Sequence, residues 1–449
     1  MNEITRQRLR RLLRIAFPML LSQASETVML FVDRLFLSRV SKVHLAAAMS
    51  GGLTAFVLSA LFAGAVGYVN AIVAQYYGSG KKQFCARATT QAIYAAFMSY
   101  PILLLFIPFT RYFFEAVGLE PEQVSLTNIY LQYLLAGSLL LVLRYALTGF
   151  FTGIGRTRIV LAANIAAMVV NIPANYVFIF GKLGLPPLGM RGAAIGTLCG
   201  GFAGTIILGI AYFRVSRGAE FRADHQWRFS GELMKKLLRF GLPAGAETFL
   251  NMGAFNLFVQ LMHSYGTDVA ASITIAFNWD LVAFIPMFGL GIATTAVVGQ
   301  HIGARDFEGA EGSAYLSLRL GYIYSGLMMV LFIAGAGPLV RVFSSGFSAS
   351  ADVVKMARIF LRLVSLYTVA DATNIIFAGS LRGAGDTKWV MRISVIVHWT
   401  LALTALLFVR VAHIQPIAVW SLFIGMILIL GFSMLFRFRS GKWKSIKLI

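Results

Sequence analysis

Five acidic residues fall in stretches of the chain that are otherwise apolar. They are Glu26, Asp33, Glu247, Asp280 and Asp371. An ionisable group in hydrocarbon is costly, so such groups usually face a water-filled cavity and bind or move an ion. Few basic residues accompany them at similar depth, and the set therefore predicts a cavity that holds cations.

Two of these acids, with one phenol, have the chemistry of a cation site. Glu247 and Asp371 come from different expected helices, and Tyr367 lies one turn before Asp371 on the same face. Their oxygens suit Na⁺, and a carboxyl pair can also hold a proton. We predict a cation-binding site at Glu247, Asp371 and Tyr367, with Na⁺ as the candidate metal ion at Glu247 and Asp371. The alternative is a hydrogen-bonded contact between two helices.

Two asparagines add neutral oxygens to the candidate set. Asn171 and Asn175 are one turn apart, so their amides lie on one face of a helix. We predict that both take part in cation binding. The alternative is that they only hold neighbouring helices together, as polar side chains often do in membranes.

The acids of the first expected helix predict a coupling role. Glu26 and Asp33 are seven residues apart, close to two turns, so they share a face. We assign both to substrate binding or proton coupling. The alternative for Asp33 is an ion pair with Arg34 or Arg39 near the outer interface.

Asp280 is a further candidate for substrate or proton coupling. The sequence defines its role less well than that of the other acids. Asp280 follows Trp279, and it could line the outer cavity or pair with Arg362. The histidines His263 and His301 are isolated and show no metal-ligand spacing, which favours packing roles.

The composition places these residues in a membrane. The chain has 58% hydrophobic and only 13% charged residues, against about 25% charged in soluble domains. The prediction is an all-α polytopic membrane protein, because stretches of about 20 apolar residues span a bilayer as helices. We expect twelve transmembrane helices, at residues 12–37, 45–77, 89–111, 124–151, 158–181, 189–213, 238–264, 268–300, 313–336, 354–381, 388–410 and 414–436.

The second half of the chain repeats the first. Gln75-Tyr76-Tyr77-Gly78 recurs as Gln300-His301-Ile302-Gly303, and Pro18 recurs as Pro243, both 225 residues later. Six spans in each half give both copies the same direction, which predicts parallel repeats with ligand sites near the place where they meet. We predict an N-lobe at 1–214, a flexible cytoplasmic linker at 215–237 and a C-lobe at 238–449.

The net charge of +21 is explained by topology. If both termini are cytoplasmic, that side collects 26 of the 39 Lys and Arg residues and the opposite side collects ten. This fits the positive-inside rule. We therefore expect a multi-pass protein of the plasma (inner) membrane with both termini in the cytoplasm. The basic residues would contact anionic lipid, not nucleic acid.

Glycine motifs provide no catalytic site. Gly153-Ile154-Gly155 and Gly383-Ala384-Gly385 fall at expected cytoplasmic turns, and no Walker A sequence or H-E-x-x-H is present. Tight turns between packed helices explain these glycines. We expect no enzyme activity and no cofactor.

With these residues in place, the chain resembles the multidrug and toxic compound extrusion (MATE) transporters over nearly its whole length. The motifs that carry the resemblance share their order and spacing with that family. They are Pro18 with Val32-Asp33, Gln75-x-x-Gly78, Thr152 to Thr157, Asn171-x-x-x-Asn175 followed by Tyr176 to Gly181, Gly192 to Thr197, Gly241-Leu242-Pro243, Gly299-Gln300-x-x-Gly303-Ala304 and Gly379 to Thr387.

Within the family the chain is most similar to the NorM branch. That branch has acids on helices seven and ten, which Glu247 and Asp371 match, and polar residues where Tyr367, Asn171 and Asn175 lie. The archaeal DinF-type branch has an aspartate near the position of Asn175, which is absent here. The resemblance implies two six-helix lobes and an antiporter that exports cationic or amphipathic compounds in exchange for Na⁺ or H⁺.

Other functions fit less well. A flippase for lipid-linked saccharides, from a related two-lobed superfamily, would line its cavity with arginines to hold pyrophosphate, whereas the intramembrane charges here are mainly acidic. An enzyme has no use for the repeat, and a channel needs a ring of charges. We expect small-molecule substrates, the lipid bilayer as surroundings and a monomer. The physiological substrate and the choice between Na⁺ and H⁺ stay open.

Overall fold

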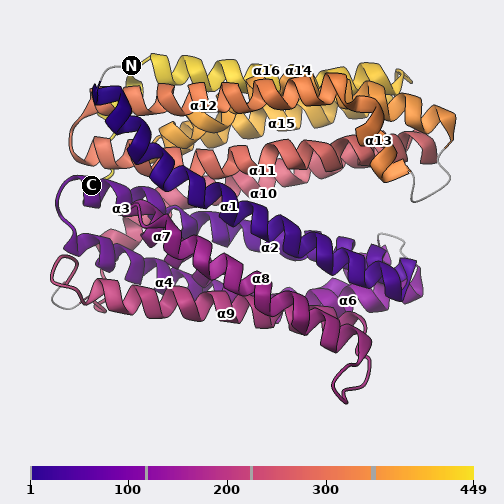
Figure 1. Cartoon of the computed structure of the whole chain (residues 1–449), viewed down its shortest axis with the longest axis horizontal. Coiled ribbons are helices and arrows are strands. Elements are labelled where there is room, and N and C mark those ends of the chain that lie inside the picture. The colour runs from indigo at the N-terminus through magenta and orange to yellow at the C-terminus, as the bar shows by residue number, and fades with distance from the viewer. Residues whose placement is uncertain (1–2, 117–119, 223–225, 345–349) are drawn as a thin grey trace. The chain divides into compact units, whose positions relative to one another are not determined.

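The computed structural model describes residues 3–116, 120–222, 226–344 and 350–449, and every regular element in these ranges is a helix (Figure 1). The long helices are α1 (Glu3–Val40), α2 (Lys42–Gly67), α3 (Val69–Gly78), α4 (Gln83–Leu104), α6 (Pro121–Ala136), α7 (Ser138–Gly153), α8 (Thr157–Phe180), α9 (Met190–Ser216), α10 (Gly231–His263), α11 (Thr267–Gly303), α12 (Phe307–Ala334), α14 (Ala351–Ala384), α15 (Thr387–Arg410) and α16 (Pro416–Arg439). Short elements are η1 (Ile107–Phe109), α5 (Thr110–Ala116), α13 (Ala336–Ser344) and η2 (Lys442–Ser445).

Each of the twelve predicted spans coincides with one helix or with consecutive helices, which confirms the predicted fold class. α2 and α3 form one span, and so do α6 and α7. Among the described residues, nine spans are long and apolar enough to cross a membrane, and the bent pair α6 and α7 makes a tenth. The other two helices, α10 and α14, carry Glu247 and Asp371, and such polar residues reduce their apolar character.

A glycine allows the bend of 46° between α6 and α7. Gly137 lies between the two helices, and a Cβ atom there would be 2.0 Å from Cδ2 of Leu198 on α9. A larger residue would require the Leu198 side chain to move. The bend therefore coincides with a close approach between helices that glycine permits.

The chain forms two compact units. Unit 1 comprises Met1–Ala16, Leu250–Ile302 and Asp306–Lys447, and unit 2 comprises Phe17–Phe249, Gly303–Arg305 and Leu448–Ile449. Most of the first half of the sequence therefore lies in unit 2 and most of the second half in unit 1. The first turns of α1 pack with unit 1, and α10 belongs to unit 2 as far as residue 249.

Unit 1 has an aromatic core at the packing of α10, α14 and α16. Phe258, Phe360 and Trp420 are each fully buried, and the rings of Phe360 and Trp420 lie 4.9 Å apart between centroids. Nearby, glycines bring α14 against α11: a Cβ atom on Gly383 would lie 2.5 Å from the carbonyl oxygen of Thr295. Burial of large rings and close helix contact together stabilise this unit.

The repeated glycine motifs are turns, as the sequence predicts. Gly155 follows α7 with φ of +78°, and Gly385 ends α14 with φ of +95°. Both conformations are left-handed, where a side chain is strained and glycine is not. The two motifs thus end equivalent helices of the two repeats.

The described part of the connection between the halves packs against unit 2. Phe221 is 2% exposed, and its ring lies 6.2 Å from that of Tyr77 and 5.8 Å from that of Phe150. Further along, Nε2 of Gln91 donates a hydrogen bond to the carbonyl oxygen of Arg228 (3.2 Å). The described residues of the connection thus make contacts within unit 2, and its flexibility stays a prediction.

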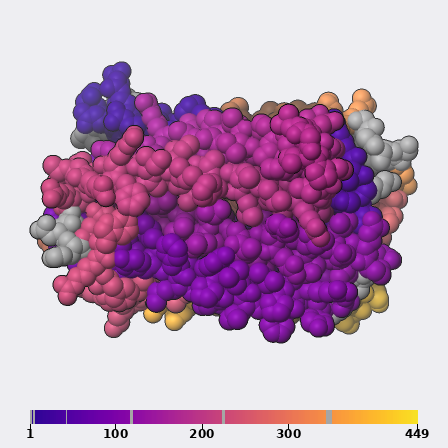
Figure 2. All heavy atoms as spheres, turned by 90° about the horizontal axis from the view of Figure 1, so that it is seen from below, coloured from indigo at the N-terminus to yellow at the C-terminus, as the bar shows by residue number. Residues whose placement is uncertain are grey.

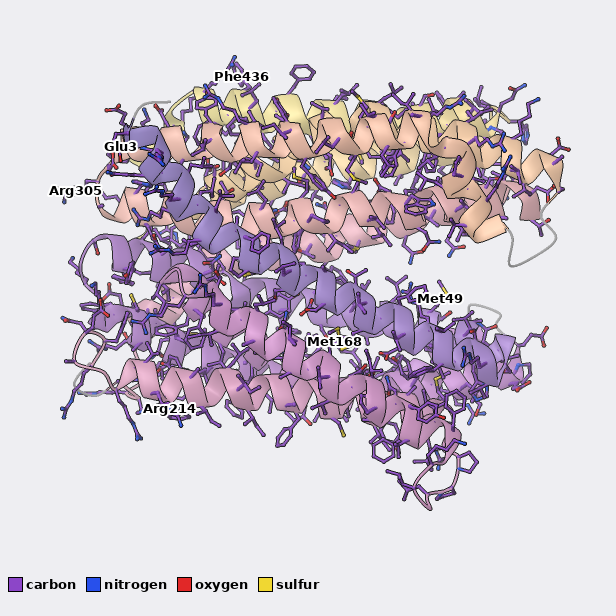
Figure 3. All side chains as sticks on the ribbon, viewed as in Figure 1. Glu3, Met49, Met168, Arg214, Arg305 and Phe436 are labelled. Atoms are coloured by element: carbon purple, nitrogen blue, oxygen red, sulfur yellow. The ribbon has the colours of Figure 1, made fainter. Side chains whose placement is uncertain are left out.

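The surface of unit 2 suits a bilayer. Figure 2 shows the face over which α4 and α9 run, in purple and pink. Phe97, Met98, Phe202 and Ile210 on these helices are 49–62% exposed. Figure 3 shows two basic residues of unit 2, Arg214 and Arg305, toward the end of this unit that lies opposite Met49.

Candidate functional site

The carboxylates of the membrane spans separate into groups, and each group lies within one unit. Unit 1 contains Asp280 on α11 and Asp371 on α14. Unit 2 contains Glu26 and Asp33 on α1 and Glu247 on α10. Each group is described with its own neighbours below.

A phenol lies between the two acids of unit 1. Tyr367 is 2% exposed, and its hydroxyl group interacts with both Asp280 and Asp371, which also interact with each other. The hydroxyl faces Asp280 without completing a hydrogen bond of standard geometry to any described residue. The side chain of Asn374, one turn beyond Asp371 in α14, interacts with Asp371. Two carboxylates, a phenol and an amide thus supply oxygens within reach of one another.

The position of the tyrosine ring is fixed by packing. Its ring meets that of Phe423 on α16 edge to face, with centroids 5.4 Å apart and planes at 80°. Such a pair restrains the ring while leaving its hydroxyl at the acids. The structure thus gives Asp280 a partner, Tyr367, that the sequence reasoning did not identify.

Glu247 is not in the unit that contains this group. It is 3% exposed and belongs to unit 2, on the part of α10 that packs closely against α2: a Cβ atom on Gly245 would be 2.0 Å from the carbonyl oxygen of Leu61. Asp371 belongs to unit 1. A joint cation site of Glu247 and Asp371 therefore stays a prediction.

Asp33 is the centre of a second group, in unit 2. Nδ2 of Asn175 on α8 donates a hydrogen bond to Oδ1 of Asp33, and the Asn171 side chain also interacts with this carboxylate. Tyr130 on α6 lies close enough to interact with Asp33 as well. The two asparagines, which the sequence reasoning grouped with Glu247 and Asp371, thus lie with Asp33 in unit 2.

Small residues of α9 create the room for this group. A Cβ atom on Gly196 would lie 2.0 Å from Oδ1 of Asn175, and one on Gly200 would lie 2.7 Å from Cβ of Asn171. The glycines therefore allow α9 to lie against the polar face of α8. Asn171 is fully buried, and neither polar atom of its side chain has a hydrogen-bond partner of standard geometry among the described residues.

A third group surrounds Glu26, also in unit 2. Nη2 of Arg144 on α7 lies 3.1 Å from Oε1 of Glu26 and 2.8 Å from Oδ1 of Asn164 on α8. Nδ2 of Asn164 in turn donates to Oε1 of Glu26 (3.0 Å) and to Oγ of Ser22 (2.6 Å). Glu26 is therefore one member of a charged network that joins three helices.

The sequence reasoning missed Arg144, Asn164 and Ser22. A signal was available for two of them: Arg144 is a basic residue inside an apolar span, and Asn164 lies seven residues before Asn171, close to two turns. Among the described residues, no three His, Cys, Asp or Glu side chains are arranged to hold a metal ion together. Oxygens from carboxylates, amides and phenols are thus the available ligands.

Comparison with known proteins identifies the family. The family model MatE matches residues 18–177 and 243–405, which is more than half of the chain, and the two matched segments begin 225 residues apart. The chain is 28% identical over 397 residues to a probable multidrug resistance protein NorM of Pasteurella multocida, covering 88% of this chain and 84% of that protein. It is 27% identical over 404 residues to a protein of the same name from Bacillus subtilis, covering 89% and 88%.

A solved structure agrees in fold. It is described as the outward-facing conformation of a multidrug resistance MATE family transporter of the MOP superfamily. The alignment has a TM-score of 0.88 at 20% identity and covers 99% of this chain and 100% of that chain. With the duplicated family match and the twelve-helix fold, these comparisons place the protein: it belongs to the multidrug and toxic compound extrusion (MATE) family of membrane transporters.

Proposed function

We propose that the protein is a secondary active antiporter that exports cationic or amphipathic organic compounds in exchange for Na⁺ or H⁺. One observation carries the proposal: each unit holds carboxylates of its own at membrane depth, next to neutral oxygens. In unit 1 these are Asp280 and Asp371 around Tyr367, and in unit 2 Asp33 lies among amides. Such groups are costly in a bilayer unless they bind something.

Antiport requires that ion and cargo favour different states of one machine. A ligand shifts an equilibrium only through its different affinity for the two states. If an ion at the acids lowers the affinity for cargo, then cargo lowers the affinity for the ion by the same factor. Carboxylates serve both ligands, because Na⁺, H⁺ and an organic cation all neutralise the same charge.

We assign the ion to the two acids of unit 1. Asp371 and Asp280 supply carboxylate oxygens, Tyr367 adds a phenol oxygen, and Asn374 adds an amide. Oxygen ligands of this kind suit a hard cation. Asp33, with Asn171 and Asn175, responds to cargo or to a proton in unit 2.

The membrane potential contributes to the driving force. Each elementary charge that crosses the membrane gains about 2.3 kcal/mol per 100 mV. That energy corresponds to roughly a 50-fold bias in an equilibrium. An ion gradient adds to it, so inward movement of one cation is able to drive cargo outward.

The cellular setting follows from charge. The excess of Lys and Arg at one end of the helices favours a plasma (inner) membrane location with both termini in the cytoplasm.

Efflux from proteoliposomes tests this function. Purified protein is reconstituted, and export of a permanently charged dye is driven by a Na⁺ gradient or by a pH gradient, each imposed alone. We expect one gradient to drive export and Asp371→Asn to abolish it. The matched control is Asp352→Asn, which alters an exposed acid in the first turn of the same helix. Export that ignores both gradients, or that survives Asp371→Asn, would refute ion coupling at this site.

One observation favours a second candidate. Arg144 places a guanidinium group inside a membrane span, as a flippase for lipid-linked saccharides would require for pyrophosphate. Its ion pair with Glu26 neutralises that charge and weakens this candidate. Translocation of a lipid pyrophosphate without dye export, in the same liposomes, would favour the flippase.

A further inference from the structure

The ion pair of Glu26 with Arg144 differs in charge from the group around Asp33 in the same unit. Glu26 and Arg144 carry opposite charges 3.1 Å apart, so their layer of the helix bundle is neutral overall. Asp33 lies seven residues further along α1, about 10 Å away at 1.5 Å per residue, and its closest partner is an amide. One face of one helix thus presents a paired carboxylate and, two turns on, a carboxylate hydrogen-bonded to an amide.

The pair is held in an oriented way. Both hydrogen bonds that Glu26 accepts from described residues arrive at the same oxygen, Oε1. Arg144 is enclosed from the other side, because a Cβ atom on Gly204 of α9 would lie 3.7 Å from its Nε. Oε2 of Glu26 is therefore the open end of a fixed carboxylate.

The two members of the pair are unequally exposed. The side chain of Glu26 is 40% exposed, whereas that of Arg144 is 14% exposed. A charged group exposed at membrane depth faces water or a bound molecule, because hydrocarbon offers it no hydrogen bond. A ligand that approaches this layer thus meets the carboxylate first and the guanidinium directly behind it.

The affinity of this ion pair for a ligand should depend on the charges that the ligand carries. A simple cation at Oε2 would lie near a second positive charge, which reduces its attraction. A molecule with a cationic and an anionic group can place the first at Glu26 and the second toward Arg144, so no charge stays unpaired. Like charges brought together, and buried charges left unpaired, are the usual means of rejecting a wrong ligand.

We propose that Arg144 is a charge-selecting residue, which makes this layer of unit 2 favour compounds carrying both a cationic and an anionic group over compounds carrying a cation alone. Asn164 is a positioning residue, because it bonds both Arg144 and Glu26 and fixes their relative placement. The inference rests on the proposed function for the nature of the ligand, a transported compound. It does not depend on the coupling ion.

Equilibrium binding of two matched dyes tests the inference. One is a rhodamine with a free carboxylate, and the other is the ethyl ester of the same dye, which is a permanent cation. Dissociation constants are measured by fluorescence polarisation at pH 8, with purified protein and no ion gradient. For the wild type we expect tighter binding of the carboxylate dye.

Substitutions that remove the charge of Arg144 or of Glu26 should shift the preference between the two dyes in opposite directions. Arg144→Gln should weaken the carboxylate dye relative to the ester by about tenfold, or 1.4 kcal/mol. Glu26→Gln leaves the guanidinium unpaired and should shift the preference further toward the carboxylate dye. Arg144→Lys keeps the charge and should retain the preference of the wild type. Arg111→Gln removes a guanidinium from an exposed pair with Glu115 on α5 and should change neither constant.

The contrary results are distinct. If Arg144→Gln and Glu26→Gln weaken both dyes equally, the pair only holds helices together and the inference is wrong. If Arg144→Gln fails to fold, the Glu26→Gln and Arg144→Lys results decide, since each keeps Arg or its charge. Shifted preferences without gradient-driven export would instead leave the inference standing and overturn antiport.

Discussion

The hydroxyl group of Tyr367 on α14 faces the carboxyl group of Asp280 on α11, and the same phenol interacts with Asp371 one turn further along its own helix. This relationship joins two helices of unit 1 through oxygens at membrane depth. It gives the unit a polar centre, which is where we propose that the coupling ion binds, and the role of the phenol oxygen can be tested directly.

Tyr367→Phe should weaken ion coupling without unfolding the protein. The ring keeps its edge-to-face packing on Phe423, while one oxygen beside Asp280 is lost. Because one oxygen ligand of the proposed ion is lost, the half-saturating ion concentration should rise roughly tenfold. Ion-dependent export is the measurement. Tyr322→Phe is the control, since that hydroxyl pairs with the neutral Thr373 (2.9 Å); an equal loss in both variants would contradict the assignment.

Gly196→Ala should displace Asn175 from Asp33. A Cβ atom at this position would lie 2.0 Å from Oδ1 of Asn175, so the amide cannot keep its place. We expect export to fall as far as in Asn175→Ala. Gly201→Ala changes the same helix where nothing lies within 4 Å, and it should retain export and gain up to about 1 kcal/mol of helix stability. Normal export by Gly196→Ala would show that the amide is dispensable.

Phe221→Ala should loosen the connection between the two halves of the sequence. The ring is 2% exposed and stacks on Tyr77, so its removal should cost about 3 kcal/mol of unfolding free energy. Thermal unfolding in detergent and protease cleavage near residue 221 measure the effect. Phe229→Ala, at a ring that is 56% exposed, serves as the comparison and should change both measurements little. Equal effects of the two substitutions would mean that the connection is not anchored through Phe221.

The ionisation of Asp306 should make the stability of the folded protein depend on pH. Burial acts to raise the pKa of this carboxyl group, but the hydrogen bonds from the Gly309 amide and from His301 outweigh it and lower the pKa below its ordinary value of 3.8. Because the pKa of Asp306 is lowered in the folded protein, its ionised carboxylate stabilises α12 when the pH is above the ordinary pKa. This stabilisation is lost as the pH falls through the lowered pKa. Asn also caps helices, so Asp306→Asn isolates the charge and should cost less than about 1 kcal/mol at pH 7.

The measurement for Asp306 is the difference in melting temperature between the wild type and Asp306→Asn across the acid range. It should be positive at pH 7 and should shrink as pH falls below 4. A difference that stays constant to pH 3 would show that ionisation of Asp306 does not stabilise the fold.

The sequence predicts the helices well because lipid leaves few alternatives. Apolar stretches of sufficient length become helices, and the turns at Gly155 and Gly385 require left-handed backbone. The bend at Gly137 was not predicted, because it depends on the approach of Leu198 from another helix. Hydropathy describes each helix alone and carries no record of such neighbours.

The site residues were harder to group than to identify. The spacing of Asn171 and Asn175 shows that they share a face of α8, but not which helix that face meets, and it meets Asp33 on α1. Arg144 neutralises Glu26 from a helix more than a hundred residues away, a pairing that no spacing in the sequence indicates. Periodicity orders side chains within a helix, and packing alone decides their partners.

The most direct test of ion-coupled export is the affinity for cargo measured as a function of the ion. The dissociation constant of a permanently charged dye is determined with the purified wild-type protein while Na⁺ is varied at fixed pH and then pH is varied without Na⁺. We expect one of the two ions to weaken dye binding by about tenfold at saturation, and we expect Asp371→Asn to abolish that dependence. Dye affinity that is the same at every Na⁺ concentration and every pH would contradict antiport through these carboxylates.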